Sequence, residues 1–257
     1  MKEFLRAAVP GWMLGIYRRR REAFREARAA DRALDEIFDE VYRARRWGGS
    51  RQAAPFFSGH GSDPGIASRY AEMVRRFIAD HGIRSVADLG CGDYRVGALI
   101  APAVERYTGI DVVPRLVDWL SETHGRPGVV DFRCADLSRD PLPEADLYLV
   151  RQVLQHLSNA RIAGFLANLP PQGWLIVTEQ QPEDERLDAP NLDKWSGGTT
   201  RLGRNSGVYL ERPPFELPGF EAKLLEVAGT GPSVHPEGLI RSFLFRLGEA
   251  APDRTGG

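Results

Sequence analysis

Residues 86–97 read VADLGCGDYRVG, and this stretch decides the expected fold. A short apolar run ends at Asp88-Leu89, two glycines follow at a spacing of two, and the pattern of a helix then begins. Gly90 and Gly92 let the backbone turn sharply and approach a ligand closely, where a Cβ would clash. The stretch therefore predicts a buried strand that ends at a nucleotide-binding turn.

Two further acids follow the next two predicted strands. Strand 106–110 is followed by Asp111, about twenty residues after the glycines, where nucleotide-binding α/β folds place the carboxylate that binds a ribose. Strand 129–134 is followed by Asp136, which can accept a hydrogen bond from an adenine amino group, and by Leu137, which can pack near the ring. Arg95 stands where the dinucleotide fingerprint has its third glycine, so the sequence supports a bound pyrophosphate poorly.

This arrangement of glycines and acids resembles the class I S-adenosylmethionine (SAM) methyltransferases, from about residue 60 to the C-terminus. The resemblance implies that the glycine turn holds the methionine part of SAM and that Asp111 and Asp136 bind ribose and adenine. S-adenosylhomocysteine would be the product, and no metal is expected. Many members have a third glycine where this chain has Tyr94, which leaves the conformation of the loop open. The expected cofactor-binding residues are Asp88, Gly90, Cys91, Gly92, Asp111, Val112, Asp136, Leu137 and Arg151.

Strand and helix patterns alternate from Ser85 onward. Strands are expected at 85–89, 106–110, 129–134, 145–150 and 173–179, with helices near 96–104, 113–123 and 158–169. This alternation predicts an α/β fold with a doubly wound parallel sheet. With a closing strand pair at 221–227 and 240–247, the resemblance implies a Rossmann-like, mostly parallel seven-stranded sheet with an antiparallel last strand, preceded by an N-terminal helical extension.

The expected domain organisation has three parts. Residues 1–60 form the helical extension and a loop, residues 61–248 the SAM-binding domain, and residues 249–257 a disordered tail. The polar stretch 182–215 is long for a loop, which predicts a substrate lid. A helix is expected over 68–81 before the first strand.

The acceptor is expected beyond the carboxyl ends of the strands. A hydroxyl nucleophile benefits from a general base, and histidine is tuned for that role near neutral pH. His156, after the fourth strand, is the first candidate, with a structural role as the alternative, and His60 is the second. The expected substrate-binding residues are Gln152, Glu179, Trp195, Arg201, Arg204 and Tyr209.

Three stretches, 47–62, 151–158 and 191–215, resemble more narrowly a bacterial subgroup of class I methyltransferases associated with cell-surface polysaccharide or glycoconjugate synthesis. This likeness implies O-methylation of a sugar, glycan or small-metabolite hydroxyl. N-methylation of a small amine is an alternative, as is a SAM-binding regulatory protein without catalysis. An RNA methyltransferase that anchors through the basic N-terminal helix is the least favoured alternative.

Composition adds several expectations about partners and location. The net charge of -1 gives no electrostatic case for nucleic acid, and two cysteines give no disulfide framework, which fits a cytoplasmic protein. Residues 1–17 are fairly apolar and precede four arginines at 18–21. That segment suggests either weak contact with a membrane surface or a solvated amphipathic helix. A homodimer is a further alternative that the sequence leaves open.

Overall fold

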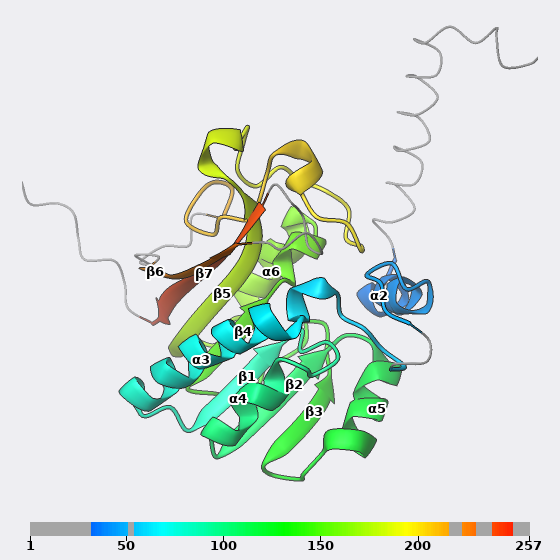
Figure 1. Ribbon diagram of the computed structural model, residues 1–257, viewed down its shortest axis with the longest axis vertical. Coiled ribbons are helices and arrows are strands. Elements are labelled where there is room, and N and C mark those ends of the chain that lie inside the picture. The colour runs from blue at the N-terminus through cyan, green and yellow to red at the C-terminus, as the bar shows by residue number, and fades with distance from the viewer. Residues whose placement is uncertain (1–31, 51–53, 216–222, 230–237, 249–257) are drawn as a thin grey trace, which may run out of the picture. The chain divides into compact units, whose positions relative to one another are not determined.

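The computed structural model describes residues 32–50, 54–215, 223–229 and 238–248 (Figure 1). The chain separates into two compact units, Met1–Ala33 and Leu34–Gly257. The expected membrane-contacting segment and the expected tail at 249–257 lie outside the described residues. Everything below concerns the second unit.

The second unit is built on a seven-stranded sheet in the order β3-β2-β1-β4-β5-β7-β6. Neighbouring strands from β3 to β5 run parallel, and β7 runs antiparallel to both β5 and β6. This is the predicted Rossmann-like topology. The strands are β1 (Ser85–Leu89), β2 (Arg106–Asp111), β3 (Val130–Cys134), β4 (Leu147–Arg151), β5 (Gly173–Pro182), β6 (Lys223–Gly229) and β7 (Gly238–Leu247).

Strand order fixes where a ligand can bind. From β1 the chain proceeds outward to β2 and β3 and then returns to β4 on the other side of β1. The carboxyl ends of β1 and β4 therefore flank the crevice at which the direction of winding reverses, the usual binding place in open α/β sheets. All five residues of β1 are buried, as expected for a central parallel strand covered on both faces.

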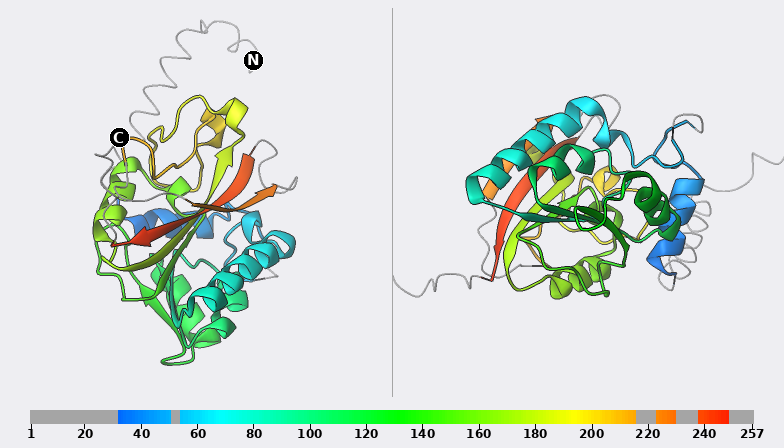
Figure 2. Two further views of the ribbon diagram at one scale, coloured as in Figure 1. Left: turned by 90° about the vertical axis from the view of Figure 1, so that its left-hand side faces the viewer. Right: turned by 90° about the horizontal axis from the view of Figure 1, so that it is seen from below.

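Helices cover both faces of the sheet. Figure 2 shows α3 (Pro64–His81) and α4 (Gly97–Ile100) on one face and α6 (Asn159–Asn168) on the other. Helix α5 (Pro114–His124) connects β2 to β3. The expected helix 96–104 is shorter in the structure: α4 gives way to a 3₁₀ turn, η2 (Ala101–Ala103), because Pro102 has no N–H to continue an α-helix.

Helix α2 (Leu34–Arg43) belongs to the same compact unit as the sheet. Its apolar residues recur at helical spacing and are buried in the main core. The unit that holds the sheet consequently begins at Leu34, earlier than the expected domain start at residue 61. The buried residues of α2 are Leu34, Ile37, Phe38, Val41 and Tyr42.

The segment 182–215 is more structured than the expected lid. It contains two 3₁₀ turns, η4 (Asp184–Arg186) and η5 (Leu202–Arg204). Asn191 is buried and its side-chain amide donates to the carbonyl oxygens of Tyr209, Arg212 and Pro213 at 2.8, 3.2 and 2.9 Å. Side-chain bonds to backbone carbonyls replace the missing helix or strand ladder here and hold the segment in one conformation.

Candidate active site

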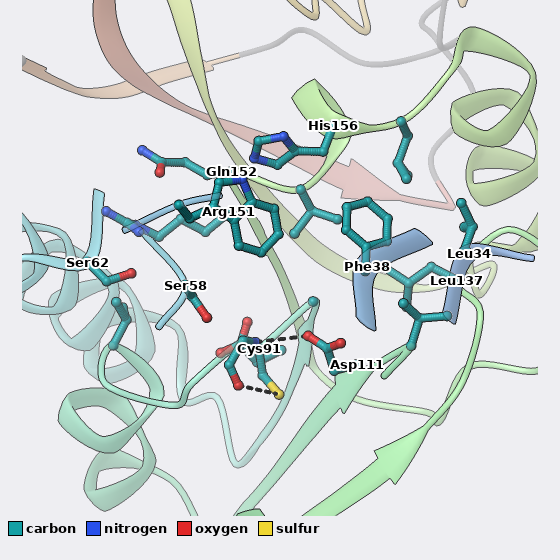
Figure 3. Close-up of a pocket in the computed structure, with 18 of the residues that line it drawn as sticks. Leu34, Phe38, Ser58, Ser62, Cys91, Asp111, Leu137, Arg151, Gln152 and His156 are labelled. Atoms are coloured by element: carbon teal, nitrogen blue, oxygen red, sulfur yellow. Dashed lines mark hydrogen bonds between the residues drawn. The ribbon is translucent and has the colours of Figure 1, made fainter. Parts of the chain in front are cut away.

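A cavity opens where the carboxyl ends of the central strands meet (Figure 3). Its empty volume is about 1020 Å³, including the open mouth. The lining residues are Leu34, Phe38, Tyr42, Trp47, Ser58, Ser62, Tyr70, Asp88, Gly90, Cys91, Gly92, Val96, Asp111, Val112, Asp136, Leu137, Ser138, Arg151, Gln152, Val153, His156 and Leu157.

The glycine turn after β1 forms the floor of this cavity. Gly90 and Gly92 have φ angles of 83° and 55°, in the left-handed region that favours glycine. A Cβ on Gly90 would overlap the side chain of Val153, and one on Gly92 would overlap Ser58 Oγ. Glycine at these two positions therefore lets Val153 and Ser58 pack directly against the backbone of the turn, which is called the glycine cradle below.

Tyr94 resolves the question left by the missing third glycine. It has a φ of 65°, so a tyrosine takes the left-handed conformation itself. Its buried ring packs against the rings of Tyr107 and Phe132, with centroids 5.4 and 5.0 Å away. Gly97 makes room for this arrangement, because a Cβ there would overlap both Tyr94 and Tyr107. Ring packing therefore offsets the backbone strain.

Asp88 lies at the bottom of the cavity and is 7% exposed. Its carboxylate accepts a hydrogen bond from the Tyr107 hydroxyl. Burial raises the pKa of Asp88 to about 6, while the Tyr107 bond and the charge of Arg151 oppose that shift. Asp88 therefore offers an anionic group at neutral pH to a cationic ligand atom.

Asp111, at the end of β2, is held by two backbone amides. Its carboxylate accepts from Gly92 N at 3.2 Å and from Val113 N at 3.1 Å. Burial raises its pKa to about 6, and these amide bonds limit the rise. The bond to Gly92 links the glycine turn to Asp111, so both sit in fixed register beside the same part of the cavity.

Asp136 follows β3 and is 2% exposed. It accepts from the amide and hydroxyl of Ser138 at 2.9 and 2.6 Å, and Arg161 lies 3.3 Å away. Near it the cavity wall is apolar: Leu137, Leu34 and Phe38 lie close together in Figure 3. An apolar slot next to an acid suits a flat heterocycle that carries an amino group.

Residues from the segments 34–50 and 54–62 line another side of the cavity. An N-terminal helix that covers the cofactor was one of two roles open from the sequence, beside support of a dimer. Ser58 exchanges two bonds with Asp93, from Ser58 N to the carboxylate (2.8 Å) and from Asp93 N to Ser58 Oγ (2.7 Å). The Tyr42 hydroxyl lies 2.9 Å from Ser58 Oγ. Trp47 donates to the carbonyl oxygen of Gly198 at 3.0 Å and packs 5.1 Å from the His156 ring. The amphipathic spacing of 34–42 shows that this helix is buried but not what it covers.

Arg151 and Gln152 form the wall opposite the adenine-type slot. Arg151 donates to the carbonyl oxygen of Gly61 at 2.5 Å and lies over the ring of Tyr70. Gln152 has a φ of 56°, and its backbone N–H donates to the Thr178 carbonyl oxygen at 2.6 Å. Its side chain lies where a Cβ on Gly61 would be. The loop around Gly61 and the end of β4 are thus fitted to each other.

His156 lines the cavity, but it is buried and only 9% exposed. Nδ1 lies 3.2 Å from the carbonyl oxygen of Thr199, so Nδ1 carries the hydrogen. Nε2 is 3.3 Å from the side-chain amide nitrogen of Gln155 and accepts from it. Burial, followed by the charge of Lys194, lowers the pKa of His156 to about 3. The ring is therefore neutral at neutral pH, in a single tautomer.

Several expected acceptor residues lie away from the cavity. His60 is exposed and pairs with Asp63 at 3.1 Å. Trp195 is 41% exposed, and Arg204 donates to the carbonyl oxygen of Asp193. Tyr209 is buried at 4% exposure under segment 182–215. None of these four is among the lining residues of the cavity.

Glu179 and Arg201 need a correction of their expected role. Both are almost fully buried, at 2% and 1% exposure, and neither lines the cavity. Glu179 accepts from the three backbone amides of residues 153–155. Arg201 donates to the carbonyl oxygens of four residues and to Asn159 Oδ1. Their polar atoms bind the protein backbone and not an acceptor.

Across the described ranges, no cluster of three or more histidine, cysteine or acidic side chains could hold a metal ion. The cavity instead combines a glycine cradle, an acid at each of three strand ends and an apolar slot. Together with the sheet topology, these features define a nucleotide-type site in a Rossmann-like protein.

Comparisons with known proteins agree with this class. Residues 87–177 match the family model described as methyltransferase domain. Nodulation protein S of Bradyrhizobium diazoefficiens is 28% identical over 121 residues, covering 45% of this chain and 58% of that protein. Human acetylserotonin O-methyltransferase is 30% identical over 112 residues, 39% of this chain and 31% of that protein. The chain thus spans under two thirds of the length of either relative.

A solved structure shares the fold. The N-methyltransferase NodS from Bradyrhizobium japonicum, in complex with S-adenosylhomocysteine, superimposes with a TM-score of 0.51 at 18% identity, over 81% of this chain and 99% of that one. Residues 87–177 therefore match a methyltransferase domain, and the chain shares the fold of an S-adenosylhomocysteine-bound N-methyltransferase. The glycine cradle and the buried acids fit SAM, and all nine residues expected to bind it line the cavity.

Proposed function

We propose that this chain is a SAM-dependent methyltransferase that transfers the methyl group of SAM to a hydroxyl of a sugar, glycan or small metabolite. When bound, SAM supplies an electrophilic methyl on a sulfonium. Gly90, Cys91 and Gly92 would hold its methionine part, with Asp88 as the partner of its ammonium group. Asp111 would bind the ribose hydroxyls and Asp136 the adenine amino group. In-line transfer then needs mainly the alignment of acceptor and methyl.

The observation that carries this proposal is the chemistry of the wall around Gln152. Ser58, Ser62, Gln152 and His156 present hydroxyls, an amide and a neutral imidazole, and Arg151 adds a positive charge. Among the described lining residues, carboxylates occur only at the three strand ends assigned to the cofactor. A protonated amine would find no counter-charge here, whereas a hydroxyl-rich neutral acceptor finds several hydrogen-bonding partners.

His156 is the group in this wall that we propose for handling the acceptor's proton. Its neutral state leaves it able to accept a hydrogen bond at Nε2 once the acceptor displaces the amide of Gln155, which lies at the long distance of 3.3 Å. The lowered pKa makes it a weak base, so we expect its effect on rate to fall at the low end of the usual 10²–10⁴-fold range.

N-methylation of a small amine is the second candidate. It is favoured by the likeness to nodulation protein S, since the NodS structure is that of an N-methyltransferase. An amine that loses its proton to water before transfer needs no base in the protein. The two candidates therefore differ in whether His156 matters.

The test is methyl transfer from labelled SAM to a panel of nucleotide sugars, oligosaccharides and small amines, followed by mass spectrometry of the product. A labelled methyl ether on a sugar supports O-methylation, and a labelled methylamine supports the second candidate. His156→Gln, measured beside wild type, should lower the rate about 10²-fold for a hydroxyl and change it little for an amine. Absence of any labelled product with folded, SAM-binding protein would refute both.

We also propose that the partner is a small molecule, that nucleic acid is not a partner, and that the protein is cytoplasmic. Over the part of the chain that the structure describes, no helix has the length and apolar character needed to cross a bilayer. We propose three functional parts: an extension (1–60), a catalytic domain (61–248) and, within it, a substrate segment (182–215). Residues of α2 and Trp47 also line the cavity.

A further inference from the structure

A single turn of 3₁₀ helix, η3 (Leu154–His156), carries much of the acceptor wall. Val153 and Leu157, on either side of the turn, line the cavity together with His156 itself. The turn has two backbone hydrogen bonds of its own, from His156 N to the Val153 carbonyl oxygen (2.9 Å) and from Leu157 N to the Leu154 carbonyl oxygen (3.0 Å). So short a ladder stabilises a turn weakly, and groups outside the turn must help to hold it.

Glu179 binds the N-terminal end of this turn. Its Oε1 accepts from Val153 N at 3.1 Å and from Leu154 N at 2.8 Å, and its Oε2 accepts from Gln155 N at 3.1 Å. A carboxylate at this end satisfies the amides that the turn leaves unpaired and complements their partial positive charge. Glu179 comes from β5, so the sheet itself fixes where the turn begins.

Arg201 binds the C-terminal end of the same turn. Its Nη1 donates to the carbonyl oxygens of Leu154 and Gln155 at 3.3 and 3.2 Å, and its Nη2 donates to that of Leu157 at 2.8 Å. The planar guanidinium can reach these carbonyls at once because its donors form a fixed fork. Glu179 and Arg201, called the bracket below, therefore bind opposite ends of one turn. Both side chains are almost fully buried.

The contacts around this turn also determine the protonation state and tautomer of His156. Gln155 Oε1 accepts from Gln180 N at 3.1 Å, which orients the Gln155 amide so that its nitrogen faces His156 Nε2. On the other side, the Thr199 carbonyl oxygen faces Nδ1, and Trp47 covers the ring. The charged groups facing this region are Lys194, whose Nζ donates to the His156 carbonyl oxygen at 3.1 Å, and Arg201. Both cations disfavour a protonated ring.

We propose that Glu179 and Arg201 are positioning residues: they hold η3 so that His156 faces the acceptor as a neutral ring with its hydrogen on Nδ1. This inference rests on the proposed function, because it concerns the wall at which the acceptor binds. Neither residue touches the cofactor cavity, so they act through the turn. Loss of either residue of the bracket should change the acceptor side of the reaction and leave the SAM loops as they are.

The first measurement is ¹⁵N NMR of the histidine rings in the full chain saturated with S-adenosylhomocysteine, with the His156 signal assigned by His156→Gln. Wild type should show a single neutral tautomer at pH 8, where the Glu179 carboxyl, whose pKa burial raises to about 7, is ionised. Glu179→Gln places an amide donor against backbone N–H groups, and Arg201→Met removes the fork. In both variants we expect the His156 signal at pH 8 to become a mixture of tautomers.

Matched controls come from an exposed ion pair far from the cavity, Arg84 and Glu105, which are 2.7 Å apart. Arg84→Met and Glu105→Gln make the same chemical changes and should leave the His156 signal as in wild type. If Arg201→Met does not fold, Arg201→Lys keeps the charge but loses the fork, and the same change is expected. Failure of the bracket variants to fold at all would assign these residues to stability alone and overturn the proposal.

The second measurement is kinetic, with the substrate from the acceptor panel that wild type methylates. Misplacing the wall by about 1 Å should lower kcat/KM for that acceptor ~100-fold, with affinity for S-adenosylhomocysteine within about twofold of wild type. An unchanged His156 signal in folded variants would overturn the inference while leaving wild-type methyl transfer intact. Absence of wild-type transfer to every panel member would instead refute the proposed function.

Discussion

Single residues at the strand ends decide what this site can bind. Asp88 and Asp111 are buried carboxylates whose pKa values are raised to about 6 by burial. Burial destabilises the charged form of each carboxyl. A cationic or hydroxyl-bearing ligand that binds there stabilises the charged form again. The site therefore contains two carboxylates whose charged form becomes more favourable when a ligand pairs with it.

Replacing Asp111 should weaken SAM binding by about 1–3 kcal/mol, the scale for losing a charged hydrogen-bond acceptor. Asp111→Asn keeps the size of the side chain, and calorimetry with S-adenosylhomocysteine measures the loss. Asp118→Asn, on the exposed face of α5, is the matched control and should bind as wild type does. Equal affinities for the two variants would remove Asp111 from the site.

The same two carboxyls predict a pH dependence of binding. The ligand pairs with the deprotonated forms, so affinity should be full above about pH 6 and should fall as the pH drops through that value. Calorimetry from pH 5 to 8 measures this change. In Asp111→Asn the fall should become shallower, since one of the two titrating groups is gone, and an unchanged slope would contradict the assignment.

Tyr94 allows backbone strain and ring packing to be weighed against each other. Tyr94→Gly relieves the positive φ, worth about 1 kcal/mol, but it removes a buried ring, which costs about 3–5 kcal/mol. The free energy of unfolding should therefore fall by about 2–4 kcal/mol in denaturant titrations. Tyr94→Phe keeps the ring and should change stability by less than about 1 kcal/mol; a stabilised glycine variant would show that strain dominates.

The residues that the sequence could and could not assign differ in physical kind. Gly90, Asp111 and Asp136 were predictable because a parallel sheet brings the carboxyl ends of its strands together, so sequence order alone places them at one site. Glu179 and Arg201 were misassigned as acceptor residues. A polar side chain near a strand end has the same sequence pattern whether it binds a ligand or backbone carbonyls, and only the fold distinguishes the two.

At the scale of secondary-structure elements, α2 both completes the core and covers the cofactor slot. Phe38 and Leu34 line the cavity, whereas Ile37 on the same helix is buried away from it. The apolar spacing of α2 was readable from the sequence. Its place over the cavity was not, because hydrophobic periodicity identifies a buried face but not the surface that it packs against.

Because Phe38 lines the cavity and Ile37 does not, substitutions at the two positions should both lower stability, but only one should weaken ligand binding. Phe38→Ala should lower the free energy of unfolding by about 3–5 kcal/mol and Ile37→Ala by about 2–5 kcal/mol, because both side chains are buried. Only Phe38→Ala should also weaken binding of S-adenosylhomocysteine, by about 1–2 kcal/mol for the lost apolar contact. Calorimetry under conditions where both variants are folded separates the two effects, and equal affinities would mean that α2 does not contact the cofactor.

For the whole molecule, the raised carboxyl pKa values predict how stability varies with pH when no cofactor is bound. Asp88 and Asp111 (about 6) and Glu179 (about 7) bind protons more tightly in the folded state. Their contribution to stability is therefore complete below the unfolded pKa values, near 4, and is lost as the pH rises to about 7. His156, with a folded pKa of about 3, acts in the opposite direction between pH 3 and 6.5.

Lys194, whose pKa burial lowers to about 7, acts in the same direction as His156 but adds little below pH 7. The three carboxyls outweigh these two groups, so the free energy of unfolding should be lower at pH 7 than at pH 5, by at least about 1 kcal/mol. Urea titrations at the two pH values measure the difference. S-adenosylhomocysteine at 100 times its Kd should add about 2.7 kcal/mol at pH 7. Higher stability at pH 7 than at pH 5 in the cofactor-free protein would mean that these carboxyls are better solvated than their burial indicates.

The absent side-chain atoms of three glycines have a consequence for how this protein can change in evolution or in the laboratory. A Cβ at Gly92 would overlap Ser58, one at Gly90 would overlap Val153, and one at Gly61 would overlap Gln152. Each pair joins parts of the chain that are distant in sequence. A chimera that takes only the glycine turn, or only the loop around Gly61, from a homologue would place new side chains against unmatched neighbours. New acceptor specificities are therefore best sought by exchanging each glycine segment together with the segment that packs against it.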